Sequence, residues 1–143
     1  MYTHILIPTD GTDASVHAID TGIRLAAQLH ARVHALHVLP PLPAVSFIAD
    51  MVQGDACKRR SIEHAQEYLD EVREKAQAAG VPCDAEYVFD NRPYAAIAGA
   101  ATKHHCDLIV MDAHTHNGIE RLMLSNVAHK VILCCDVPVL VCH

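Results

Sequence analysis

Five short apolar runs, separated by segments with helical spacing, constrain what this chain can fold into. They lie at residues 5–8, 31–39, 83–89, 108–111 and 137–142, and we predict each as a β-strand. The second run is apolar enough to be covered on both sides, which is typical of a parallel sheet. Strands that alternate with helices form βαβ units, whose right-handed crossovers build a doubly wound sheet. We therefore predict an α/β fold with helices on both faces.

The segments between these runs predict four helices. The first begins near Asp13 or Ser15 and repeats apolar residues at helical spacing: Ala14, Ala18, Ile19, Gly22, Leu25, Ala26 and Leu29. The longest spans 55–79, ends before Gly80 and turns its acidic residues to water: Glu63, Glu67, Asp70, Glu71 and Glu74. The others span 93–104, with Pro93 in the first turn, and 127–133. Pro40 to Pro43 end the second strand, and residues 44–54 show no clear period.

Length and charge exclude several classes of protein. A chain of 143 residues fits one domain, here 1–143, and can bury roughly two thirds of its unfolded surface. The net charge of -6 and the lack of a basic cluster beyond Lys58-Arg59-Arg60 argue against nucleic acid as a partner. No apolar run approaches the ~18 residues of a membrane span, and no export signal is visible. We expect a cytoplasmic protein without a membrane partner.

Cysteine and histidine are the unusual components of the composition. The six cysteines contain no C-x-x-C pair, so we expect buried or half-buried free thiols rather than disulfides. Protonation of all 12 histidines would move the formal charge from -6 to +6. A pH-responsive protein is therefore one hypothesis for the function.

Three stretches of the sequence carry a family resemblance. They are Ile5-Leu-Ile-Pro8-Thr-Asp10-Gly11 in the first strand and turn, His37-Val38 in the second strand, and Val110-Met111 in the fourth. Together they resemble the universal stress proteins over essentially the whole chain. The resemblance implies a flavodoxin-like, adenine nucleotide alpha hydrolase-like sheet of order 3-2-1-4-5. It also implies a non-enzymatic stress-response protein that acts as a homodimer.

The nucleotide-binding loop of that family is altered here. In its ATP-binding members, Val-Met is followed by Gly-x-x-Gly, nine residues, and Gly-Ser or Gly-Thr. In this chain the glycine positions hold Asp112, Thr115 and Ser125, and Asn126 stands at the Ser/Thr position. The resemblance thus assigns a candidate nucleotide site to Pro8, Asp10, Val38, Met111, Asp112, Thr115, Ser125, Asn126 and Val127. We expect weak or no ATP binding, and no other cofactor.

Asp10 and Asn126 of this candidate site also have purely structural interpretations. Asp10 can bond nearby backbone N–H groups in an Asx-turn. Asn126 can cap the helix at 127–133, and that helix start can also bind an anion. Asp112 places a negative charge near a polyphosphate, unless a divalent cation bridges the two.

Asp112, His114 and His116 form a candidate metal site, because a carboxylate and two imidazoles within five residues suit zinc or nickel. This spacing is not a specific signature, and we predict that no metal is bound. His30, His34, His37 and the pair His104-His105 are weaker candidates. His37 stands on an apolar strand, where we expect a core histidine with its hydrogen bonds made.

Catalytic motifs are missing from the sequence. No serine has a G-x-S-x-G setting, no cysteine has an obvious histidine and acid pattern, and six glycines form no phosphate-binding loop. We expect no enzyme.

Residues 138–142 predict an apolar strand at a sheet edge, which a second copy of the chain would cover. Three hypotheses remain: a stress-response dimer with weak or no ATP binding that acts by protein contact or by its accumulation under stress, a nucleotide sensor, and a metal- or pH-responsive module.

Overall fold

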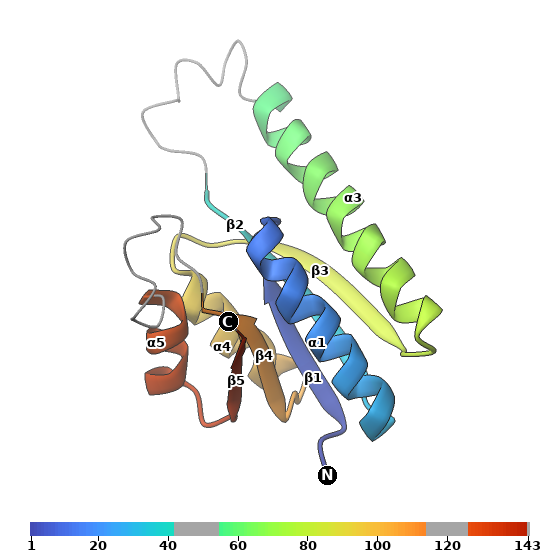
Figure 1. The fold of residues 1–143 in the computed structure, drawn as a ribbon. Coiled ribbons are helices and arrows are strands. Elements are labelled where there is room, and N and C mark those ends of the chain that lie inside the picture. Colours follow the sequence, from blue (N-terminus) through green and yellow to red (C-terminus); the bar gives the residue numbers. More distant parts are fainter. Residues whose placement is uncertain (42–54, 114–125, 143) are drawn as a thin grey trace.

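A computed structural model describes residues 1–41, 55–113 and 126–142, which form one parallel sheet flanked by helices (Figure 1). The strand order is β3-β2-β1-β4-β5, as the family resemblance implied. The strands are β1 His4–Thr9, β2 Arg32–Leu39, β3 Cys83–Phe89, β4 Leu108–Asp112 and β5 Val139–Cys142. The helices are α1 Asp13–Leu29, α3 Asp55–Ala78, α4 Pro93–Lys103 and α5 Asn126–Cys134. The predicted doubly wound α/β fold is confirmed.

Two apolar clusters hold the layers together, one on each face of the sheet. Helices α1 and α3 cover one face, where Ile5 and Ile7 of β1 pack with Ile19 of α1 and Leu69 of α3. Helices α4 and α5 cover the other face, where Leu6 is the β1 residue of the cluster. Successive residues of a strand point to opposite faces, so β1 supplies both clusters. Its residues Ile5, Leu6 and Ile7 have no exposed surface.

The ends of the elements differ from the predictions by one or two residues. Strand β1 runs from His4 to Thr9, and β5 begins at Val139 instead of 137. Pro138 lacks an N–H group for the strand ladder, although its carbonyl accepts a hydrogen bond from the Ile109 N–H. Helix α3 ends as predicted, because Gly80 adopts a φ of 71° that favours glycine.

The cysteines are free thiols in the part of the chain that the structure describes. Cys106 and Cys142 are buried, and Cys83 and Cys135 are half-buried, as expected. The prediction was wrong for Cys134, which is exposed. It is the last residue of α5. Within the described ranges, no helix is long and apolar enough to cross a membrane.

Gly22 sets how closely α1 approaches the sheet. A Cβ atom at this position would lie 2.5 Å from Cδ1 of Ile7 and 3.6 Å from Cβ of Val110. Ile7 and Val110 are both fully buried, so neither has free space to move into. A side chain at Gly22 would therefore push the helix away from β1 and β4.

We predict that Gly22→Ala and Gly99→Ala have different effects on stability. Gly99 is an exposed glycine of α4 with nothing within 4 Å of an added Cβ, so alanine there should raise the free energy of unfolding by about 0.5–1 kcal/mol. Gly22→Ala gains the same helix propensity, but its new methyl group would overlap the Ile7 side chain, which costs about 1–3 kcal/mol. Urea denaturation of both variants measures the difference. Equal stabilisation by the two alanines would contradict the close packing of α1.

Candidate functional site

The direction of winding of the sheet reverses between β1 and β4, and a parallel sheet commonly binds ligands at that point. Strand β1 pairs with β2 on one side, where Thr9 lies opposite His37, and with β4 on the other. The carboxyl end of β1 leads into the turn of Asp10 and Gly11, and β4 ends at Asp112. The region at the carboxyl ends of β1 and β4 is the first candidate site, and we call it the cleft after the crevice that such sheets commonly form there.

Asp10 shapes the turn that follows β1. Its Oδ1 accepts hydrogen bonds from the Thr12 N–H at 2.9 Å and from the Thr12 hydroxyl at 2.5 Å. Gly11 adopts a φ of 78°, a conformation in which glycine is favoured. The structural interpretation of Asp10 as an Asx-turn residue is therefore confirmed. One carboxylate oxygen orders the turn, which places backbone N–H groups beside the cleft.

Three hydroxyl groups lie under this turn. Thr9 and Ser15 are buried, and their oxygens are 3.0 Å apart. The hydroxyl of Tyr68, from α3, is 3.0 Å from both of them. Ser15 also donates to the Thr12 carbonyl at 2.8 Å. This triangle joins the end of β1, the start of α1 and the middle of α3.

His37 lies beside the same turn. Its ring is 5.9 Å from that of Tyr68, and a Cβ added to Gly11 would lie 3.3 Å from its Cε1 atom. Burial lowers the pKa of His37 more than the carboxylate of Asp10 raises it, so the ring is neutral at pH 7. The expected core position is confirmed. The prediction that both ring nitrogens of His37 form hydrogen bonds was wrong, because Nδ1 has no partner among the residues the structure describes.

The structure brings together part of the predicted nucleotide site. Pro8 and Met111 are buried in adjacent strands, Val38 is half-buried near the end of β2, and Asp112 is the half-buried last residue of β4. Val127, in the first turn of α5, packs against the apolar cluster under α4 and α5. Helix α5 begins at Asn126, one residue before the predicted start at 127, so Asn126 is its first residue instead of the residue that precedes it. Thr115, Ser125, His114 and His116 lie outside the described residues, so the prediction that Asp112, His114 and His116 bind no metal stays untested.

Comparisons with known proteins agree with this fold. The sequence model of the universal stress protein family matches residues 1–143. The chain belongs to the universal stress protein family. A universal stress protein of Methanocaldococcus jannaschii is 35% identical over 141 residues, which cover 99% of this chain and 82% of the relative.

Two solved structures place this universal stress protein among its relatives. The UspA protein of Lactobacillus plantarum has a TM-score of 0.86 at 23% identity, covering 99% of this chain and 98% of the other. A universal stress protein in complex with cAMP has a TM-score of 0.72 at 26% identity, covering 99% and 97%.

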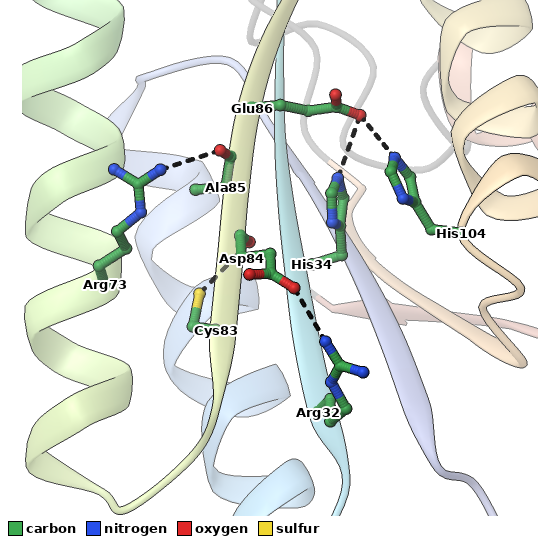
Figure 2. Close-up of polar contacts among 8 residues, drawn as sticks. All are labelled: Arg32, His34, Arg73, Cys83, Asp84, Ala85, Glu86 and His104. Atoms are coloured by element: carbon green, nitrogen blue, oxygen red, sulfur yellow. Dashed lines mark hydrogen bonds and ion pairs between the residues drawn. The ribbon is translucent and has the colours of Figure 1, made fainter.

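A second polar cluster of this universal stress protein lies on the face of the sheet covered by α4. His34 of β2, Glu86 of β3 and His104 at the end of α4 point toward one another (Figure 2). Sequence reasoning ranked His34 and His104 as weak candidates and did not consider Glu86. The three residues do not form a short sequence motif, because 52 positions separate His34 from Glu86 and 18 separate Glu86 from His104.

The charges of this cluster follow from burial and hydrogen bonding. Burial lowers the pKa of His34 more than Glu86 raises it, and His104 lowers it further. Burial alone would raise the pKa of Glu86, but the hydrogen bonds of His104 and His34 outweigh this effect and lower it. Near neutral pH the cluster therefore holds a carboxylate and a neutral His34 ring.

The buried thiols of this universal stress protein are poor nucleophiles. Burial raises the pKa of Cys106 to about 11, and Asp107 adds to the effect. Burial also raises the pKa of Cys83 and of Cys142. Because the thiolate is the reactive form, these three cysteines are almost entirely protonated and unreactive at pH 7.

We predict that Tyr68→Phe lowers the free energy of unfolding by about 1–2 kcal/mol, because two buried hydroxyls lose one of their partners. Tyr87→Phe is the matched control, since the described part of the chain shows no hydrogen bond for the Tyr87 hydroxyl. Chemical denaturation of both variants measures the effect. Equal losses for the two changes would argue against a structural role of the hydroxyl triangle.

Proposed function

We propose that this universal stress protein is a non-enzymatic stress-response protein of the cytoplasm. It acts as a homodimer through its last strand and binds ATP weakly or not at all. The observation that carries the proposal is the position of Asp112, which ends β4 at the carboxyl edge of the sheet. The family's ATP-binding members have glycine at the corresponding position.

Asp112 opposes a polyphosphate in two ways. Its side chain occupies space that a glycine leaves to the ligand. Its charge also repels phosphate, since two like charges ~4 Å apart cost about 1 kcal/mol in water and about 4 kcal/mol at an effective dielectric constant of ~20. Within this range, repulsion of about 1.4 kcal/mol or more would weaken ATP binding tenfold or more.

A nucleotide-binding sensor is the second candidate function. Two observations favour it: a relative of similar fold is solved in complex with cAMP, and Pro8, Asp10, Val38 and Met111 keep the family's residues. A ligand with one phosphate carries less negative charge than ATP. It would meet less repulsion from Asp112, so a mononucleotide is the ligand to test for this function.

We predict that the combined variant Asp112→Gly, Thr115→Gly, Ser125→Gly and Asn126→Ser binds Mg-ATP at least tenfold more tightly than the natural protein. The changes remove one repelling charge and permit close backbone approach, and the new serine keeps a hydroxyl at the start of α5. The expected difference is about 1.4 kcal/mol. Titration calorimetry of both proteins with Mg-ATP measures it.

Two further titrations sharpen this test. Asp112→Asn keeps the size of the side chain and removes its charge, so its affinity separates repulsion from bulk. Titration of the natural protein with cAMP tests the sensor. Tight and equal ATP affinities of the natural and combined variants would replace the non-nucleotide proposal with the sensor.

The dimer proposal rests on the exposed edge of the sheet. Strand β5 pairs with β4 on one side and ends the strand order on the other. Leu140, in this strand, is 40% exposed, and Ile132 and Leu133 of α5 are 42% and 71% exposed. Apolar side chains beside an edge strand favour pairing with a second copy of the same strand.

We predict that Leu140→Lys converts the dimer into monomers, because a charged side chain would have to be buried at the two-fold axis. Phe89→Lys is the matched control: Phe89 is 38% exposed on β3, the opposite edge of the sheet. Sedimentation at micromolar concentration measures both variants. A natural protein that sediments as a monomer would overturn the proposal, and so would dissociation by Phe89→Lys alone.

A further inference from the structure

The cluster of His34, Glu86 and His104 has the geometry of a ligand set. The Nε2 atoms of His34 and His104 lie 3.1 and 3.0 Å from the same atom, Oε1 of Glu86. The two rings stack with centroids 3.9 Å apart and an interplanar angle of 24°. One atom of each residue lies within 4.8 Å of the others. Figure 2 shows that both ring nitrogens point at the carboxylate.

These distances match the size of a zinc coordination shell. Ligand atoms 2.0–2.1 Å from a tetrahedral zinc ion are about 3.3 Å from one another. The two nitrogen-to-oxygen distances, 3.1 and 3.0 Å, are therefore close to the edges of such a tetrahedron. An ion between the three atoms would replace the two hydrogen bonds, and both imidazole rings would have to turn so that their Nε2 lone pairs meet at it. A fourth coordination position would remain for water.

The donor set also selects the kind of metal. Two imidazoles and one carboxylate suit zinc and related transition metals, whereas calcium and magnesium prefer oxygen ligands. The supporting elements are rigid, because His34 and Glu86 stand on paired strands of the sheet. The side chains of Glu86 and His104 are 29% and 25% exposed, so an ion can reach them from solvent. That of His34 is only 5% exposed and forms the base of the site.

We propose that His34, Glu86 and His104 bind one zinc ion on the face of the sheet covered by α4. This site is separate from the nucleotide cleft. His34 stands five residues before the end of β2 at Leu39, which corresponds to roughly 16 Å at about 3.3 Å per residue. The ion would join two strands to the end of α4. Because zinc would bind the folded chain and not the unfolded one, it would stabilise the fold.

The test is a zinc titration of the full chain at about pH 7.5, after removal of metal with EDTA. We expect the natural protein to bind one equivalent of zinc, and His104→Asn and Glu86→Gln to bind it at least tenfold more weakly. His105→Asn is the matched control, because it removes the neighbouring exposed histidine and should leave the affinity unchanged. His114→Ala with His116→Ala removes the candidate loop site and should also leave it unchanged.

Thermal unfolding gives an independent readout. Zinc should raise the Tm of the natural protein and leave that of Glu86→Gln unchanged. Circular dichroism shows whether each metal-free variant is folded, and if His104→Asn is not, Glu86→Gln decides the test. No zinc binding by the natural protein would reduce the cluster to hydrogen bonds only. Equal affinity of the natural protein and Glu86→Gln, or loss of zinc in the His114 and His116 variant, would also overturn the proposal.

Discussion

The burial of β1 is the constraint on which the rest of the structure depends. This strand has a neighbour on each side and helices on both faces, so its backbone groups must pair within the sheet. Asp107 fixes its beginning: the carboxylate accepts hydrogen bonds from the N–H groups of Thr3 and His4 at 2.8 and 3.0 Å. Burial alone would raise the pKa of Asp107, but these bonds lower it. The residue before β4 thus positions the start of β1.

Polar side chains on such buried strands need partners. His34 meets this requirement through Glu86, and Thr9 through Ser15 and Tyr68. His37 meets it only in part, since burial keeps its ring neutral and Nδ1 has no partner in the described ranges. A buried polar group without a hydrogen bond costs about 1–3 kcal/mol. The region around His37, directly under the turn of Asp10 and Gly11, therefore carries an unmet hydrogen-bonding requirement beside the cleft.

The two candidate sites use different properties of one fold. The candidate cleft at the carboxyl ends of the strands includes Asp112, the last residue of β4, where the family's ATP-binding members have glycine. The histidine cluster depends on side chains that extend from one face of the sheet to α4 (Figure 2). His34 and Glu86 stand on the paired strands β2 and β3, so the cluster does not use residues of the cleft.

Local signals in the sequence determined the elements of this protein and one part of its site. Apolar runs marked the strands, Gly80 marked the end of α3, and Asp10 predicted a turn whose hydrogen bonds reach only two residues along the chain. Order 3-2-1-4-5 came from the family resemblance. Only the tertiary structure joined Tyr68 to Thr9, and Glu86 to His34 and His104. Those contacts depend on strand register and helix packing, which propensities of neighbouring residues do not specify.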